Sequence, residues 1–213
     1  MQKLLIKGGK KLSGEVVISG SKNASLPIII SSLLFDDAIS FENVPKVRDI
    51  YTLISLIRVL GREVDFDQDK EILKISKKNK DKYFAPYSIM KTMRAGVLVL
   101  APLLAKFGKA RVSLPGGCSI GARPVNLHLE ALKKLGAKIN VKNGYIDAIA
   151  PKGLSGSNIK FPSISVGATE SIIIAAVLAK GITKISNAAI EPEIIDLINF
   201  LNKCGADIKY NSK

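Results

Sequence analysis

The residues with the clearest chemical potential lie in the segment VSLPGGCSIGARP, at positions 112–124. This segment places Cys118 in a glycine-rich stretch, five residues before Arg123. A nearby cation and the start of a helix both stabilise the thiolate, which is the nucleophilic form of cysteine. The pattern therefore predicts a reactive cysteine in a glycine-rich loop, and the alternative interpretation is an inert loop cysteine.

A second group of residues has the types that bind anions. Cationic or small polar residues precede each of three apolar segments, and they are Lys22 and Asn23, then Lys91 and Arg94, then Ser165, Gly167 and Thr169. The first turn of a helix offers free N–H groups and a partial positive charge. If the three segments form parallel helices, their starts gather at one end and form an anion-binding face. The alternative interpretation is that these residues are only caps and solvated charges.

An internal repeat must position these groups. Residues 26–43 align without a gap on residues 170–187, and a less regular middle copy begins at Arg94. Segments 47–66, 124–141 and 192–210 each show an amphipathic helix, a glycine typical of a helix end and an alternating strand. We therefore expect an α/β (α+β) fold, namely an inside-out α/β barrel of about three βαβαββ-type repeats with buried parallel helices. A doubly wound sheet is the competing arrangement.

Two other reactive residue types are predicted to be structural. Cys204 falls on Leu60 and Leu135 in the repeat, where it is the last apolar residue before the glycine, so we expect it to pack in the core. His128 lies one turn into the helix that is expected to start at Pro124. A lone histidine on a helix is more often structural than catalytic, and we keep that interpretation for His128.

The composition excludes several classes of protein. The 213 residues are 47% hydrophobic, which is enough for one large domain or two small ones. The longest apolar runs reach about half of a membrane span, and no secretory signal is visible, so we expect a cytoplasmic protein without a membrane partner. Two cysteines and one histidine argue against a disulfide framework and against a zinc site.

The net charge of +14 raises the alternative of a basic RNA-binding domain. Aromatic residues make up only 6% of the chain and the lysines are scattered, so we expect solvated lysines and no nucleic-acid partner. The chain has neither a GxxxxGK[ST] loop nor a GxGxxG loop, which argues against an ATPase and against a Rossmann dehydrogenase.

Five segments together closely resemble the UDP-N-acetylglucosamine enolpyruvyl transferase (carboxyvinyltransferase) family. They are ISGSKNASLPI, PYSIMKTMRAGVLVLAPLLAKFG, VSLPGGCSIGARPVNLHLEALKKLGA, SVGATESI and NAAIEPEIIDLINFL. The resemblance implies transfer of the enolpyruvyl group of phosphoenolpyruvate to the 3′-hydroxyl of UDP-N-acetylglucosamine, with release of phosphate. This is the committed step of peptidoglycan synthesis, and it uses addition and elimination with no metal or organic cofactor.

The resemblance also implies roles for individual residues. Cys118 would protonate phosphoenolpyruvate or add to it covalently, and it would be the target of fosfomycin; Lys22 would be the second catalytic residue. The positions that hold phosphoenolpyruvate correspond to Lys22, Asn23 and Arg123. The positions that contact the nucleotide sugar correspond to Arg94, Arg123, Pro124, Val125, Asn126, Leu127, Ser163, Ile164, Ser165 and Val166.

The chain departs from the family pattern in three ways. Asn126 stands where the family usually has aspartate, and Ser163 stands where some relatives have lysine, so two charges change. Family members are also roughly twice as long and have two domains. We therefore expect residues 1–21 to be a first strand that packs with an absent second domain, and residues 22–213 to be the enolpyruvyl transferase-like repeat domain, truncated at its C-terminal end. The chain would need that second domain for activity, and the domain is either supplied in trans or absent; the alternative is a catalytically inactive UDP-sugar-binding fragment.

Overall fold

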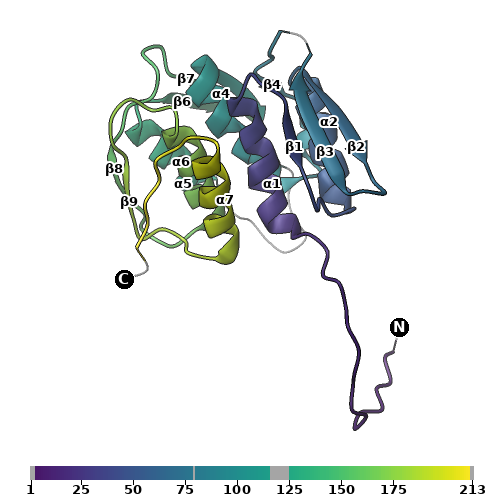
Figure 1. Cartoon of the computed structure of the whole chain (residues 1–213). Coiled ribbons are helices and arrows are strands. Elements are labelled where there is room, and N and C mark those ends of the chain that lie inside the picture. The colour runs from purple at the N-terminus through teal and green to yellow at the C-terminus, as the bar shows by residue number, and fades with distance from the viewer. Residues whose placement is uncertain (1–2, 79, 116–124, 212–213) are drawn as a thin grey trace.

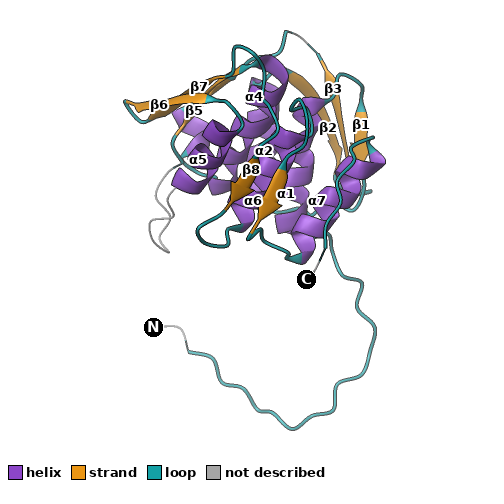
Figure 2. Ribbon diagram, turned by 90° about the vertical axis from the view of Figure 1, so that its left-hand side faces the viewer, coloured by secondary structure: helices purple, strands orange, loops and turns teal. Residues whose placement is uncertain are grey.

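The computed structural model describes residues 3–78, 80–115 and 125–211. Three separate sheets lie on the outside of the molecule, and the helices occupy its middle (Figures 1 and 2). The chain passes through three related repeats, each of which combines a buried helix, an amphipathic helix and a small sheet. The expected repeat architecture with buried helices is confirmed, and the described residues form no closed barrel.

The first repeat starts with helix α1 (Lys22–Ser31), which continues into the 3₁₀ turn η1 (Ser32–Leu34). Strand β1 (Ile39–Phe41), helix α2 (Arg48–Val59) and strands β2 (Arg62–Asp67) and β3 (Ile72–Lys77) follow. The sheet has the order β1-β3-β2, and β3 runs antiparallel to both neighbours. Because β3 is central, both of its edges are paired.

The second repeat has the same plan with an extra strand. Its elements are β4 (Phe84–Ala85), α3 (Tyr87–Met90), η2 (Arg94–Val99), α4 (Leu100–Phe107), β5 (Lys109–Ser113), α5 (Asn126–Lys134), β6 (Lys138–Lys142) and β7 (Tyr145–Ile149). The sheet has the order β4-β5-β7-β6. Strand β4 runs parallel to β5, and the central strand β7 runs antiparallel to β5 and β6.

The third repeat has the smallest sheet. Strand β8 (Asn158–Lys160) precedes helix α6 (Val166–Ala176), and strand β9 (Lys184–Ser186) precedes helix α7 (Pro192–Lys203). Strands β8 and β9 pair in parallel, as β4 and β5 do. Residues 206–210 come after α7, at the place in the repeat where β2 follows α2 and β6 follows α5. Unlike β2 and β6, they form no strand.

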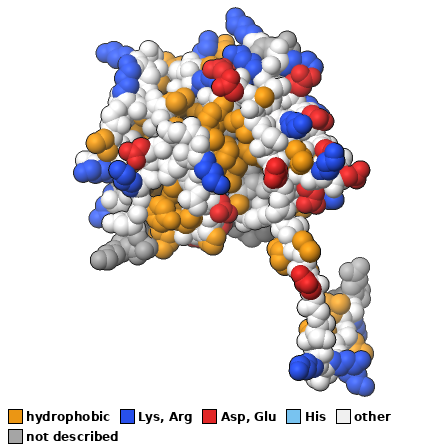
Figure 3. Space-filling model, viewed as in Figure 1, with side chains coloured by type: hydrophobic (Ala, Val, Ile, Leu, Met, Phe, Trp, Pro, Cys, Tyr) orange, Lys and Arg blue, Asp and Glu red, His pale blue; other side chains and the backbone are white. Residues whose placement is uncertain are grey.

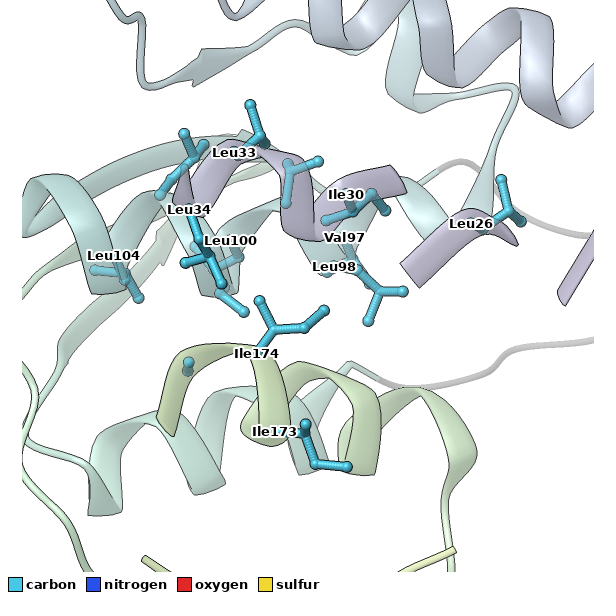
Figure 4. Close-up of a cluster of buried hydrophobic side chains, with 14 of the residues drawn as sticks. Leu26, Ile30, Leu33, Leu34, Val97, Leu98, Leu100, Leu104, Ile173 and Ile174 are labelled. Carbon is cyan, nitrogen blue, oxygen red and sulfur yellow. The ribbon is translucent and has the colours of Figure 1, made fainter. Parts of the chain in front are cut away.

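The core lies between the helices, where side chains of α1, η1, η2, α4 and α6 meet (Figure 4). Leu26 and Ile30 of α1 and Ile173 and Ile174 of α6 belong to this cluster. Helix α6 is buried at every residue from 168 to 175, as its apolar sequence predicts. Burial of each large aliphatic side chain contributes about 1.5–3 kcal/mol, so this cluster is the main source of stability.

The amphipathic helices end as the sequence predicts. Gly61, Gly136 and Gly205 have φ angles of 98°, 98° and 99°, which places all three in the left-handed region. A residue with a Cβ is strained in that region, so glycine is the natural residue after the last helical turn. The chain then reverses toward the sheet at the same point in each repeat.

Two expectations differ from the structure. Residues 3–21 form no strand and are almost entirely exposed as a tail that projects from the domain, so their expected packing with a second domain stays a prediction (Figures 1 and 2). Cys204 is exposed, whereas Leu60 and Leu135 are buried, so the prediction that Cys204 packs in the core is wrong. The segments that cover Leu60 and Leu135 follow β3 and β7, and no described segment takes that place beside α7.

Candidate functional site

A cavity of about 750 Å³ opens where the starts of several helices meet. Lys22 and Asn23 of α1, Arg94 of η2 and Val166 of α6 line it. The walls also include Val125, which immediately precedes α5, and Glu193 in the first turn of α7. The three repeats therefore present their helix starts to one space, in the arrangement that the sequence predicted for an anion-binding face.

The first and third repeats begin their buried helices with the same cap. The backbone N–H of Ala24 donates to Ser21 Oγ at 3.4 Å, and the N–H of Ala168 donates to Ser165 Oγ at 3.3 Å. Each serine carbonyl also accepts a bond from a hydroxyl one turn later, on Ser25 or Thr169. Each cap bonds one of the free N–H groups of the first turn, so the others stay available to a ligand.

Two cations of the described residues, Lys22 and Arg94, face the cavity. Lys22 Nζ lies 3.0 Å from a carboxylate oxygen of Asp49, and both side chains are partly exposed. Because an exposed ion pair contributes little to stability, the ammonium can exchange this partner for an anionic ligand at small cost. Arg94 is half-buried, and none of the ion pairs among the described residues involves it.

His128 lies in the wall of the cavity, in the first turn of α5. Burial, together with the nearby charge of Arg94, lowers the pKa of His128 to about 4, so the imidazole is neutral at pH 7. Its ring packs on the start of α6, because a Cβ placed on Gly167 would lie 3.2 Å from His128 Cε1. His128 Nδ1 is buried and has no hydrogen-bond partner among the described residues. The sequence predicted a structural role for His128 but did not indicate that its side chain lines the cavity.

Glu170 is the residue of the cavity that the sequence analysis missed. It lies in the second turn of α6 with 6% of its surface exposed. Burial raises the pKa of Glu170 to about 7, and the negative charges of Glu193 and Glu191 add to the effect. A carboxyl group with a pKa near 7 can donate or accept a proton at neutral pH. The sequence feature that indicates such a role for Glu170 is the presence of one acidic residue in the largely apolar segment ATESIIIAA.

The structure brings together part of the predicted set of binding residues. Lys22, Asn23, Arg94, Val125, Ser165 and Val166 all line the cavity. Asn126 and Leu127 lie in the first turn of α5, between the lining residues Val125 and His128. Ser163 and Ile164 are exposed in the loop before α6 and are not among the lining residues. Cys118, Arg123 and Pro124 lie outside the described residues. Pro115, the last described residue before them, lines the cavity.

Metal-ligand clusters and membrane-spanning helices are both absent from the described part of the chain. No group of three or more His, Cys, Asp or Glu side chains is arranged there to hold a metal ion. The helices of the same residues are all too short or too polar to cross a membrane.

Comparisons with known proteins converge on one group. The family model for EPSP synthase (3-phosphoshikimate 1-carboxyvinyltransferase) matches residues 6–213. A UDP-N-acetylglucosamine 1-carboxyvinyltransferase of Pelagibacter ubique is 58% identical over 213 residues, which are 100% of this chain and 51% of that protein. The enzyme of the same name from Geotalea uraniireducens is 56% identical over 208 residues, 98% of this chain and 49% of that protein. The chain thus spans about half the length of these curated relatives.

Solved structures agree on the fold. The enolpyruvyl transferase NikO from Streptomyces tendae superposes with a TM-score of 0.79 at 21% identity, covering 95% of this chain and 47% of that chain. An EPSP synthase from Acinetobacter baumannii gives a TM-score of 0.71 at 17% identity, covering 93% of this chain and 45% of that chain. At these identities the likeness concerns the fold, and again about half of each neighbour is matched.

Proposed function

Because the chain belongs to the EPSP synthase (3-phosphoshikimate 1-carboxyvinyltransferase) family, we propose that it is half of an enolpyruvyl transferase that acts on UDP-N-acetylglucosamine. The donor is phosphoenolpyruvate, the acceptor is the sugar 3′-hydroxyl, and phosphate is released. Relatives more than 50% identical carry the name UDP-N-acetylglucosamine 1-carboxyvinyltransferase, which favours this acceptor over a shikimate derivative.

The observation that carries the proposal is the cavity at the helix starts. Both substrates are anions, and Lys22 and Arg94 face the same space as the free N–H groups of α1 and α6. Cations and aligned N–H groups that are fixed before the reaction stabilise the charge that develops during transfer. Partial exclusion of water strengthens each of these contacts.

The roles of the residues follow from this arrangement and from the family resemblance. Lys22 and Asn23 bind phosphoenolpyruvate, and Arg94 binds the nucleotide sugar together with Val125, Asn126, Leu127 and the 163–166 segment. Cys118 protonates the vinyl carbon or adds to phosphoenolpyruvate, and Arg123 holds the phosphate. The positions of Cys118, Arg123 and Pro124 stay predictions, since they lie outside the described residues.

The reaction adds the sugar oxygen to the carbon that bears the phosphate and a proton to the vinyl methylene carbon, while the hydroxyl gives up its own proton to a base; this gives a tetrahedral intermediate. Elimination then breaks the carbon–oxygen bond to phosphate, and loss of a proton from the methyl carbon restores the double bond. Proton transfer is needed in both steps, and Glu170 and Cys118 are the groups that we assign to it. Neither step requires a metal or an organic cofactor.

A second half is part of the proposal. The relatives are about twice as long as this chain, and we propose that the half of the relatives that this chain does not span supplies the other wall of the cavity. The tail at residues 1–21 would pack with that half. A cytoplasmic location and the absence of nucleic-acid and membrane partners are retained as predictions.

The test measures phosphate release from phosphoenolpyruvate in the presence of UDP-N-acetylglucosamine. The purified chain is assayed alone and with a polypeptide that spans the second half of the Pelagibacter ubique relative. Cys118→Ala is the test variant, and Cys204→Ala is the matched control because it removes the other cysteine of the chain. We expect release from the mixture, its loss in Cys118→Ala and its retention in Cys204→Ala.

The other outcomes separate the alternatives. Binding of UDP-N-acetylglucosamine without phosphate release from any mixture would replace the proposal by an inactive sugar-binding fragment. Release that persists in Cys118→Ala would remove Cys118 from the mechanism. Steeply salt-dependent binding of RNA that the UDP-sugar does not displace would favour an RNA-binding domain instead.

A further inference from the structure

The second sheet has an outer face that the proposed function does not use. The inward residues of its strands β5 and β7 are buried in the core, and they are Ala110, Val112, Ile146 and Ala148. Neighbouring residues of a strand point to opposite sides of the sheet. The residues that alternate with these four therefore point away from the helices, and together with those of β4 and β6 they form the outer face of the second sheet.

Positive charge dominates this outer face. Four cations point outward from β5 and β6, and they are Lys109, Arg111, Lys138 and Lys142. Asp147 is the one carboxylate on the outward side of the four described strands, and its oxygen lies 3.5 Å from Arg111 Nε. Because this pair is exposed, water screens it. The three lysines form no ion pair with the described residues, so the face keeps a net positive charge.

The first sheet shows that a lysine-rich composition does not make every outer face basic. The outward residues of β2 are Glu63, Asp65 and Asp67, and the outward charge of the central strand β3 between its ladders is Lys74. Figure 3 shows acidic side chains gathered on the right of the molecule, where Figure 1 places the first sheet. Two related sheets thus carry opposite charges, so the overall charge of +14 does not account for the basic face.

Aromatic rings lie among the cations of the second sheet. The rings of Phe84 and Tyr145 stack with their centroids 5.8 Å apart. Lys109 Nζ lies 4.2 Å from the ring centroid of Tyr83, and Arg111 Cζ lies 5.0 Å from that of Tyr145. These contacts fix the two cations before a partner arrives, which reduces the entropy that binding costs.

Fixed cations beside exposed apolar area fit a polypeptide that carries acidic residues. Phe84 and Ile149 are 42% and 47% exposed, and aromatic residues and arginine are enriched at protein interfaces. A single-stranded nucleic acid needs free ring faces on which its bases stack, whereas the rings of Tyr83 and Tyr145 already carry a cation. The chain's own tail is disfavoured by charge, because residues 3–21 contain four lysines and one glutamate.

We propose that the outer face of the second sheet is a docking surface for an acidic segment of another protein. Carboxylates of that segment pair with Lys109, Lys138 and Lys142, and an apolar side chain beside them contacts Phe84 and Ile149. The face lies on the opposite side of the sheet from the helices, whose starts line the cavity. Docking there therefore involves neither end of the chain, and it does not rest on the proposed function.

The test measures binding of a fluorescein-labelled peptide by fluorescence anisotropy. The probe is a short run of aspartate and glutamate with two central phenylalanines, and the control probe has lysine at each acidic position. Lys138→Glu/Lys142→Glu reverses two charges of the face, and Lys109→Glu reverses a third on another strand. Lys70→Glu/Lys74→Glu is the matched control, because it changes the net charge equally at exposed lysines in or directly before β3. Urea unfolding verifies that each variant is folded.

Docking predicts saturable binding of the acidic probe with a Kd below about 100 µM, and no binding of the lysine probe. Lys138→Glu/Lys142→Glu should weaken binding at least about tenfold, and Lys109→Glu about threefold or more. Lys70→Glu/Lys74→Glu should change it less than about twofold, since salt screens charges on a distant sheet. Absence of saturable binding, or equal weakening in this control, would overturn the proposal.

Three other results would overturn it in favour of a different occupant. Displacement of the probe by a single-stranded uridine oligonucleotide at a lower concentration would indicate a nucleic-acid surface. A dimeric mass by light scattering that only the face variants lose would indicate a second copy of the chain. Loss of probe binding when the second half of the Pelagibacter ubique relative is added would assign the face to that half. Phosphate release in the same mixtures reports on the proposed function separately, because the face variants change no residue that lines the cavity.

Discussion

Replacing Glu170 by glutamine should make the stability of the protein less dependent on pH. Glu170 lies almost fully buried at the cavity, and its pKa is raised from an ordinary value of 4.5 to about 7. Folding therefore favours the protonated carboxyl group. Glutamine keeps the shape and stays neutral at every pH, so the variant isolates the cost of holding the charged form.

The sign follows from proton binding. Between pH 4.5 and pH 7 the unfolded chain has lost the proton of Glu170, while the folded chain still holds it. The folded state binds more protons, so the free energy of unfolding falls as the pH rises through this window. A rise of the pKa from 4.5 to about 7 corresponds to roughly 3 kcal/mol when it is fully expressed. Glu170→Gln should therefore match the parent at pH 4 and exceed it by up to this amount at pH 8.

The assay is urea unfolding at several pH values from 4 to 8.5, with the difference in free energy between variant and parent plotted against pH. In thermal unfolding the same difference should appear as roughly 6–12 °C at pH 8 for a chain of this size. Glu63→Gln is the control, because its carboxylate forms an exposed ion pair with Lys78. Its difference from the parent should stay small at every pH.

A difference between Glu170→Gln and the parent that does not change with pH would refute this reasoning. It would mean that the carboxyl group ionises as it does in water, and that the cavity stabilises the charge by contacts absent from the described residues. The assignment of Glu170 to proton transfer would then lose its physical basis.

Three further substitutions test other parts of the fold. Arg62→Ala removes a buried guanidinium that donates to the carbonyls at the end of η1 and lies 3.2 Å from a carboxylate oxygen of Asp81. This substitution should lower the free energy of unfolding in urea by roughly 3–5 kcal/mol. The control Lys70→Ala, which removes an exposed ion pair with Asp67, should lower it by less than about 1 kcal/mol. His128→Asn should remove a loss of stability that the parent shows as the pH falls from 6.5 to about 4, since burial keeps the imidazole neutral there; an unchanged dependence of the urea midpoint on pH would contradict this. Gly61→Ala should cost at least about 1 kcal/mol more than Gly205→Ala in the same assay, because both glycines have φ near 98° but only at Gly61 would a Cβ lie 2.9 Å from a backbone oxygen.

Much of the fold could be predicted because its determinants are local. The glycines after the amphipathic helices need only a left-handed φ, which the sequence signals directly. The apolar segments at the starts of the three repeats indicate buried helices by their composition alone. The gathering of the helix starts then follows from the repeat, since equivalent elements in related units point the same way.

The rest depends on neighbours that no single segment reveals. Glu170 looks like an ordinary helical carboxylate until α7 places Glu193 beside it and the core buries it. Cys204 has the spacing of a core residue but is exposed, because the segments that contact the equivalent Leu60 and Leu135 come from beyond the next strands and have no counterpart among the described residues at Cys204. Ser163 and Ile164 were grouped with Ser165 by motif, yet only Ser165 caps α6 and reaches the cavity.

The buried helices divide their tasks along their length. The bodies of α1, α4 and α6 fill the core, while the turns at which α1, η2 and α6 begin face the cavity. Lys22 and Arg94 do not belong to the apolar core, so substitutions at these two positions leave the packing of the helix bodies intact. A fold built in this way can present different ligand contacts by a handful of exchanges at equivalent positions, and Lys22, Arg94 and Val166 begin the three related helices with three different side chains.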